Sequence, residues 1–186
     1  MLLEELKNFN APVYTKTKRS VESYTATAVY VTANLERLVE LYRNTKNDEQ
    51  TYRLIRDDID NALRRYHQYC IKENFGAHYT ERGLEGNGIF EHMIPASRIR
   101  DLLLAKVITS EQACNMPTCR LSKERDDKLR EAGWASKTPD LYNFWKRYEY
   151  SFDIADVFET YDGADVDTNM TLEDHFAKFI GVTTVQ

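Results

Sequence analysis

An acidic residue and a histidine stand side by side at Glu91-His92, directly after an apolar step and directly before Met93-Ile94-Pro95. Imidazole titrates near neutral pH and can take a proton from water, whereas a hard carboxylate oxygen suits Mg²⁺ or Mn²⁺. Side chains alternate along a strand, but at a frayed strand end the backbone can turn both groups towards one site. The pair therefore predicts half of a hydrolytic metal site.

The motif around this pair resembles that of a known family. Glu91-His92-Met93-Ile94-Pro95 is similar to the first motif of the HNH, or ββα-metal, endonucleases, an Asp/Glu-His pair often followed by a hydrophobic residue and proline. The resemblance continues more loosely through Cys119-Arg120-Leu121-Ser122 as the second strand and residues 123–129 as the metal-finger helix. It spans residues 88–129 of a chain of 186.

The resemblance implies a role for each polar residue of this segment. In the family, the histidine of the pair is the general base that activates water, and the preceding acid binds the metal. His92 would therefore be the base and Glu91 the first metal ligand. A further ligand is expected on the helix, where Asp126 fits the role and Glu124 and Asp127 stand as alternatives.

The resemblance also implies that Asn115 would fill the family's middle asparagine role, which holds the loop and orients the base. Two features depart from the family pattern. The helix of residues 123–132 carries neither histidine nor asparagine. The two strands are also separated by an insertion that contains a helix, where the simplest family members have a short loop.

The reaction implied by the resemblance is metal-assisted hydrolysis of nucleic-acid phosphodiester bonds, with Mg²⁺ or Mn²⁺ as the cofactor. His92 would deprotonate a water that attacks phosphorus in line, while the ion stabilises charge on the departing oxygen. The expected partner is nucleic acid, with DNA favoured over RNA. Cations that can position phosphates stand close by, although each also fits a solvated helix face: Arg98, Arg100, Arg120 and Lys123.

Composition limits the classes open to this chain. Its 186 residues and 42% hydrophobic content suffice for one buried core with a smaller lobe. The formal net charge of −5 excludes a passive nucleic-acid coat. No apolar run approaches the roughly 18 residues of a membrane span, and the acidic start is unlike a signal peptide. Three cysteines leave at least one unpaired, so the expected compartment is the reducing cytosol.

The first lobe, residues 1–75, is predicted to be an antiparallel helical hairpin. Apolar positions recur at intervals of three and four between residues 21 and 42 and again between residues 52 and 70, with the turn-like Asn44–Asp48 segment between them. Tyrosines crowd the seam of the pair. Such a seam suits either a core with wet edges or a surface for a partner protein or a second copy of the chain.

The second lobe, residues 76–186, begins with a glycine-rich stretch at which the helical pattern stops. The predicted fold class is mainly α with a small β element (α+β), in which a ββα-metal-like lobe with added helices follows the helical hairpin. The aromatic stripe that follows Pro139 favours a core role. Strands are expected at Ile89–His92 and Thr118–Ser122, and helices from Ala96, Ser110, Lys123, Pro139 and Thr171.

A function of another class fits the same sequence. A non-enzymatic, acidic helical interaction protein would bind a partner through the tyrosine-rich seam, or block a nucleic-acid-binding protein by presenting carboxylates. The nuclease needs Glu91, His92 and an acid of the 124–127 stretch close together, whereas the interaction protein does not. Antiparallel pairing of Ile89–His92 with Cys119–Ser122, with the next helix packed across them, is the arrangement that favours the nuclease.

Overall fold

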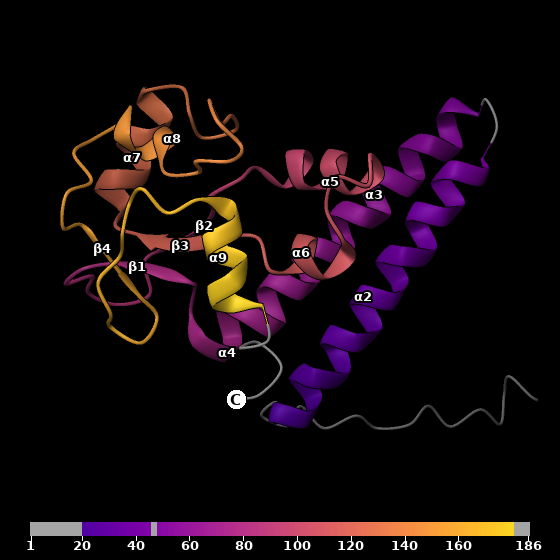
Figure 1. Ribbon diagram of the computed structural model, residues 1–186, viewed down its shortest axis with the longest axis horizontal. Coiled ribbons are helices and arrows are strands. Elements are labelled where there is room, and N and C mark those ends of the chain that lie inside the picture. Colours follow the sequence, from indigo (N-terminus) through magenta and orange to yellow (C-terminus); the bar gives the residue numbers. More distant parts are fainter. Residues whose placement is uncertain (1–19, 46–47, 181–186) are drawn as a thin grey trace, which may run out of the picture.

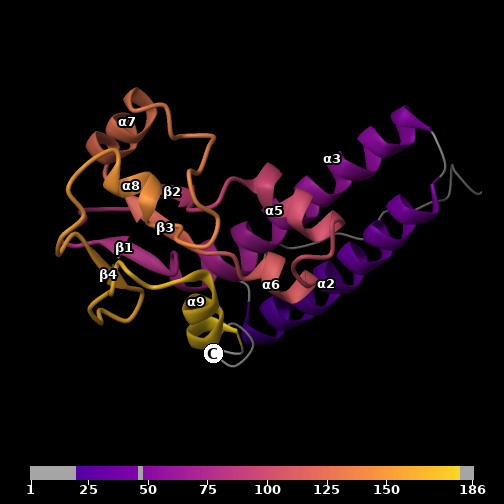
Figure 2. The same ribbon diagram turned by 45° about the horizontal axis from the view of Figure 1, so that its top comes forward.

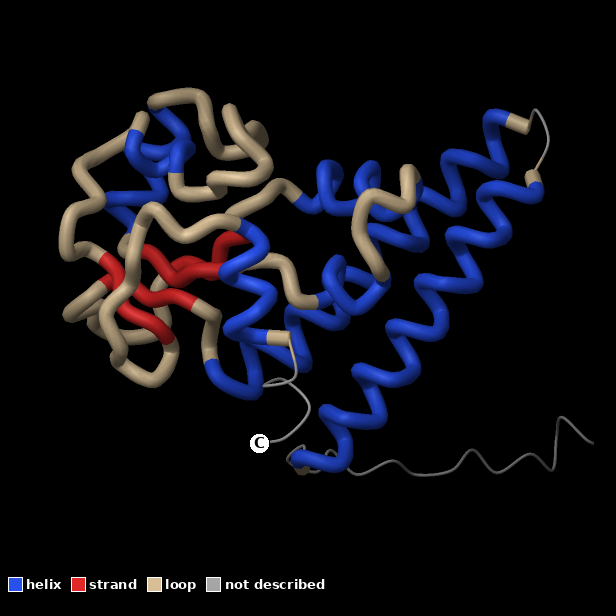
Figure 3. Tube along the Cα trace, in the orientation of Figure 1, coloured by secondary structure: helices blue, strands red, loops and turns tan. Residues whose placement is uncertain are grey.

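The computed structural model describes residues 20–45 and 48–180. Figure 1 shows a long antiparallel helix pair on one side and a lobe with a small sheet on the other. Figure 3 shows that loops connect most elements of the sheet lobe. The predicted class, mainly α with a small β element, is confirmed. Residues 1–19 of the predicted hairpin lobe and residues 46–47 of its turn lie outside the described part.

The helix pair consists of α2 (Val21–Asn44) and α3 (Glu49–Tyr66). Each helix has a side-chain cap, since Ser20 and Asp48 accept hydrogen bonds from N–H groups of the first turns. Residues three and four apart face the partner helix and exclude water from the seam. The predicted hairpin is thus confirmed, with these residues buried in the seam: Ala28, Val31, Leu35, Leu38, Ile55, Ile59 and Leu63.

The second helix of the pair changes its winding towards the sheet lobe. α3 passes into the π-helical turn η1 (His67–Lys72) and then into the single turn α4 (Glu73–Phe75). Gly76, with φ of 92°, ends the helix in a conformation that suits glycine. π-helical turns are rare and often occur at functional sites. This one buries His67, Cys70 and Ile71 together.

Four short strands form one mixed sheet with the order β2-β3-β1-β4. β2 (Ile89–His92) pairs antiparallel with β3 (Thr118–Leu121), β3 pairs parallel with β1 (Tyr79–Glu81), and β1 pairs antiparallel with β4 (Phe158–Thr160). The two predicted strands are confirmed as β2 and β3. The sequence does not indicate β1 and β4, because three residues are too few for an alternation to be recognised.

The remaining helices flank the sheet and the helix pair. α5 (Ala96–Leu104) and α6 (Ser110–Cys114) form the insertion between β2 and β3 and pack against α2 and α3. α7 (Lys123–Glu131) follows β3, and Figure 2 shows it with α8 (Lys146–Glu149) in the sheet lobe, far from the free end of the helix pair. α9 (Leu172–Phe179) completes the described chain.

One predicted helix is wrong. The sequence predicts a helix from Pro139 through the aromatic stripe, but this stretch consists of turns apart from the four residues of α8. The Asp140 side chain accepts the N–H groups of Tyr142 and Asn143 as a helix cap does, but the Tyr142 carbonyl accepts the N–H of Leu172, so the helical hydrogen-bond pattern is not continued. The stripe nevertheless enters the core as expected, with these side chains buried: Phe144, Trp145 and Tyr148.

One group of buried apolar side chains runs from the helix pair into the sheet lobe, from Leu35 through Tyr79 to Phe179. The three cysteines, all among the described residues, are buried and form no disulfide. Within residues 20–45 and 48–180, no helix combines the length and the apolar character that crossing a membrane requires.

Candidate active site

β2, β3 and α7 form a strand-strand-helix unit around the Glu91-His92 pair. The antiparallel register puts Glu91 opposite Cys119 and His92 opposite Thr118. The insertion of α5 and α6 therefore leaves the pairing of the two strands intact. This is the arrangement that the nuclease interpretation requires of the backbone.

α7 is fixed to the sheet by its first residues. The Ser122 hydroxyl caps the helix, and the Ser122 N–H donates to Oε2 of Glu81 at 2.7 Å. The other oxygen of Glu81 pairs with Arg125 Nε at 3.0 Å. A carboxylate on β1 thus holds the start of α7, which sets the position of every later side chain on that helix.

Glu91 and His92 lie on opposite faces of β2, because successive side chains of a strand alternate. Glu91 contacts Arg147, whereas His92 contacts His67. The structure differs here from the expectation that a frayed strand end turns both side chains to one site, since His92 is still paired within the strand. β2 is an edge strand of the sheet formed by the described residues, so no further strand pairs with its outer edge.

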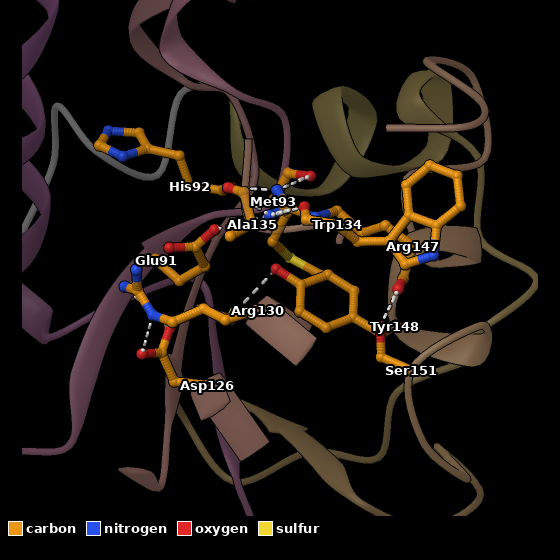
Figure 4. A network of polar contacts seen from close by, with 11 residues as sticks. Glu91, His92, Met93, Asp126, Arg130, Trp134, Ala135, Arg147, Tyr148 and Ser151 are labelled. Carbon is orange, nitrogen blue, oxygen red and sulfur yellow. Dashed lines mark hydrogen bonds and ion pairs between the residues drawn. The ribbon is translucent and has the colours of Figure 1, made fainter. Parts of the chain in front are cut away.

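Glu91 is held by a buried arginine that the sequence did not single out. Oε1 of Glu91 accepts a hydrogen bond from Nη2 of Arg147 at 2.8 Å, and the Arg147 side chain is fully buried. Burial raises the pKa of Glu91, and the charge of Arg147 opposes this rise. Figure 4 shows that Arg147 also ties together backbone segments, by donating to the carbonyls of His92, Met93, Trp134 and Ala135.

Asp126 lies on the same side of the sheet as Glu91. Its side chain is only 4% exposed and accepts Nε of Arg130 at 2.8 Å. Burial is the main cause that raises the pKa of Glu91, and the negative charge of Asp126 adds to the rise. In Figure 4 the Glu91 carboxylate lies close to the Asp126–Arg130 pair, and the His92 ring points away from it.

Glu124 and Asp127, the alternative ligands, face solvent. Glu124 is 76% exposed and pairs with Lys128, while Asp127 is 45% exposed and pairs with Lys123. Both are contacts between residues four apart on one helix. Of the three acids considered on α7, the structure therefore brings Asp126 to Glu91 and directs the other two to the surface.

The pair of Glu91 and Asp126 fits a hard divalent ion. Mg²⁺ is commonly held by one or two carboxylates and keeps several waters. Arg130 is 60% exposed and is the partner that an ion would replace at Asp126. Within the described ranges, no group of three or more His, Cys, Asp or Glu side chains is placed to hold a metal. Water and substrate oxygens would therefore complete the coordination.

The imidazole of His92 lies half-buried between β2 and η1. Its Nε2 is 2.8 Å from Nδ1 of His67, and the two ring centroids are 4.7 Å apart. Burial, followed by the positive charges of Arg64 and Arg147, lowers the pKa of His92 to about 4. His92 is thus neutral at neutral pH and able to accept a proton.

Asn115 is buried at the C-terminal end of α6. Its side-chain amide donates a hydrogen bond to the Glu111 carbonyl at 2.9 Å, and its backbone carbonyl accepts a hydrogen bond from Nε2 of His175 at 2.8 Å. The connection to His92 runs through its neighbour, because the Cys114 carbonyl contacts the same His67 that pairs with His92. Asn115 therefore stabilises the segment behind the base.

Two of the four cations predicted to bind phosphate are engaged by other groups of the protein. Arg100 is buried and pairs with Asp60 at 2.7 Å. Arg120 donates to the carbonyls of Gly86 and Asn87 at 2.6 and 2.7 Å. In this structure both guanidinium groups connect segments of the chain.

The other two cations lie at the surface. Arg98 is exposed on α5, and Lys123 is 76% exposed beside Asp127. Arg64, which the sequence interpretation did not include, is exposed on α3, and its charge lowers the pKa of His92. Arg64 thus places a positive charge within electrostatic range of the proposed base.

Two residues of this site, Arg147 and His67, stand among apolar positions in the sequence, which indicates that each needs a buried partner. Arg147 stands within the aromatic stripe of residues 141–152, and a charge among core aromatics requires a partner. His67 directly follows Tyr66 on the apolar side of its helix, and a buried imidazole likewise requires a partner. In neither case did the sequence indicate which partner, because each partner lies far away along the chain.

Comparisons with known proteins add no relative. No protein-family model, curated protein or solved structure matches this chain. A function is therefore inferred from the geometry of the site.

Proposed function

We propose that this protein is a metal-dependent endonuclease that hydrolyses nucleic-acid phosphodiester bonds by an HNH-type mechanism, with DNA favoured over RNA. The observation that carries the proposal is the β2-β3-α7 unit, which places Glu91 and Asp126 in each other's electrostatic field and a neutral imidazole at the next position of the same edge strand.

His92 is the proposed general base. It is neutral at neutral pH, so it needs no prior deprotonation to accept a proton from water. Arg64 is exposed and within electrostatic range of His92, so it is suited to hold a phosphate near the ring. A buried base of lowered pKa is a weaker proton acceptor than free imidazole, but it stays in its active form at every pH above that value.

Glu91 and Asp126 are the proposed ligands of Mg²⁺ or Mn²⁺. The ion, when bound, would stabilise negative charge on the phosphate and the departing oxygen. Arg147 holds Glu91 by Oε1 and fixes its position on the strand. Arg130 neutralises Asp126 in the structure and would have to leave it for an ion to bind.

The three buried cysteines, none of them in a disulfide among the described residues, fit a proposed location in the cytosol, a reducing compartment. There the chain would meet nucleic acid directly. Since its net charge is −5, binding would depend on local cations such as Arg64 and Arg98.

Plasmid cleavage by the purified protein tests the proposal. The native chain is compared with His92→Ala and Glu91→Ala in Mg²⁺, in Mn²⁺ and in EDTA. We expect metal-dependent nicking that both substitutions abolish and that Glu131→Gln, a change at an exposed acid of α7, leaves intact. A folded native protein that cleaves neither DNA nor RNA with any metal would contradict it.

The second candidate, a non-enzymatic interaction protein, is favoured by one observation. The helix pair exposes large apolar side chains, with Val29 66%, Tyr30 61% and Leu54 59% exposed. Exposed apolar groups on a helix pair are compatible with a protein partner or a homodimer. Absence of cleavage together with self-association at micromolar concentration would favour this function.

A further inference from the structure

His67 forms a hydrogen-bonded chain with the proposed base. Nδ1 of His67 lies 2.8 Å from Nε2 of His92, and Nε2 of His67 lies 3.0 Å from the carbonyl oxygen of Cys114. His67 is 1% exposed and belongs to the π-helical turn η1. The chain thus runs from β2 through η1 to the end of α6.

The direction of each hydrogen bond follows from the chemistry of the acceptor at the far end. A carbonyl oxygen accepts only, so Nε2 of His67 carries the proton that faces Cys114. His67 is neutral, because burial holds its pKa well below the usual value, and a neutral imidazole has a single N–H. Nδ1 of His67 is therefore an acceptor, and the proton of the contact with His92 resides on Nε2 of His92.

We propose that His67 is a positioning residue that fixes the tautomer and the ring orientation of His92, so that Nδ1 of His92 is the atom that takes the proton from water. This inference rests on the proposed nuclease function. In the reaction, one O–H bond of water breaks and its proton moves to Nδ1. The remaining hydroxide forms a new P–O bond while the P–O bond to the departing sugar oxygen breaks, and that oxygen takes up a proton from solvent. The Nε2–H bond to His67 stays in place throughout.

The far end of the chain is rigid enough to serve as a reference point. The Cys114 carbonyl ends α6, whose first turn is held by a reciprocal capping box between Thr109 and Gln112. The ring of Tyr66 packs edge-on against His67 at 6.1 Å. The His67 ring is held at both nitrogens and by the Tyr66 ring, so it has little freedom to rotate. Its tautomer therefore determines which nitrogen of His92 carries the proton.

Two substitutions separate positioning from simple structural bridging. Asn at position 67 keeps an acceptor oxygen near the place of Nδ1 and loses the distant donor. Gln at position 67 reaches the place of Nε2 and can still donate to Cys114, but it offers His92 no acceptor. His67→Asn and His67→Gln thus each keep one of the two bonds.

Steady-state cleavage with Mg²⁺ is the first readout. Loss of a group that orients an active-site histidine typically lowers activity roughly 10- to 100-fold. We expect His67→Gln to lose kcat in that range with little change in KM, and His67→Asn to retain most of kcat. If the contact only bridges lobes, His67→Gln keeps the rate of the native protein, which would overturn the inference.

Nitrogen-15 NMR of the full native chain is the second readout, and it needs no variant and no activity. We expect His92 to show a protonated Nε2 and an unprotonated Nδ1, with Nε2 protonated in His67. The opposite tautomer of His92 would overturn the inference. If the native chain cleaves nothing yet shows these tautomers, the nuclease function fails while the hydrogen-bond chain stands, so the two failures are distinguishable.

Discussion

The two faces of β2 stabilise their buried polar groups differently, one by ion pairs and the other by hydrogen bonds between neutral groups. On the face towards α7, Glu91 and Asp126 are acids that each form an ion pair with an arginine. On the other face, His92 and His67 are neutral and share hydrogen bonds that end on a carbonyl. One step along the strand thus separates an ionic environment from a neutral one.

This contrast shows how a single strand can supply two kinds of chemistry. The ionic face offers two carboxylates to a divalent ion, and each carboxylate is paired with a separate arginine in the structure. The neutral face keeps an imidazole in its basic form, because burial disfavours the charged ring. The difference between the faces is testable by perturbing each one separately.

The largest expected effect is loss of stability in acid, to which the two histidines of the neutral face and the two other buried histidines contribute. Burial lowers the pKa of all four histidines, to about 4 in His92 and about 3 in His175, and well below the usual value in His67 and His78. Below pH 6.5 these histidines therefore bind protons in the unfolded chain that they do not bind in the folded chain. The free energy of unfolding should fall by about 1.4 kcal/mol per pH unit for each histidine.

Urea unfolding between pH 7 and pH 5 measures this loss, and one histidine offers a matched control. His78 uses Nδ1 as a hydrogen-bond acceptor, while its Nε2 has no hydrogen-bond partner within the described residues. His78→Asn keeps an acceptor near the same place without the titrating ring. We expect it to reduce the pH slope by about one proton. A stability that stays constant from pH 6.5 to pH 5 would contradict this account.

The next effect concerns Arg147 on the ionic face. Arg147→Met keeps most of the volume but leaves Glu91 without its partner, and the carbonyls bound by the guanidinium lose their donors. Breaking a buried ion pair in this way typically lowers the free energy of unfolding by about 3–5 kcal/mol. Denaturant unfolding at pH 7 measures it. Arg98→Met, at an exposed arginine, should change stability by less than about 0.5 kcal/mol, and equal losses in both variants would refute the assignment.

A smaller effect is expected at Arg130, which competes with metal for Asp126. Arg130→Gln removes the positive charge from this carboxylate. We expect Mn²⁺ to bind roughly fivefold more tightly, as one nearby charge in water predicts. Calorimetric titration with Mn²⁺ measures the change, with Lys128→Gln on the same helix as the control. Unchanged affinity in Arg130→Gln would place the ion elsewhere.

The smallest effect concerns Arg64 and the ring of His92. The charge of Arg64 helps to lower the pKa of His92, so Arg64→Gln should raise that pKa above about 4. NMR titration of the His92 ring measures the shift. Arg65→Gln removes the neighbouring charge, which lines a surface pocket with Tyr30 on α2, and should leave the ring unaffected. A shift of the same size in both variants would show that Arg64 does not face His92.

The fold was predictable where its signals were local. Long runs of apolar residues at intervals of three and four define α2 and α3, and caps such as Thr171 mark where a helix starts. β1 and β4 were missed because three residues show no period. The predicted helix after Pro139 was wrong because a buried aromatic stripe has the same spacing whether or not its backbone is helical.

The site was predictable only in its local part. Glu91, His92 and Asp126 belong to motifs that the sequence displays directly. Arg147 and His67 belong to the site because the chain folds back on itself, which brings together residues 56 and 25 positions apart. Composition and spacing indicate that buried charges need partners, but they do not identify those partners.

The central claim is that the two faces of β2 act on one phosphodiester, and one experiment addresses it directly. Single-turnover cleavage of a nucleic-acid substrate is measured against Mg²⁺ concentration for the native chain, Glu91→Gln and His92→Gln. We predict that Glu91→Gln raises the Mg²⁺ requirement at least about tenfold. His92→Gln should leave that requirement unchanged and lower the saturated rate roughly 10²- to 10⁴-fold. Folded native protein without cleavage, or native rates in His92→Gln, would contradict the account.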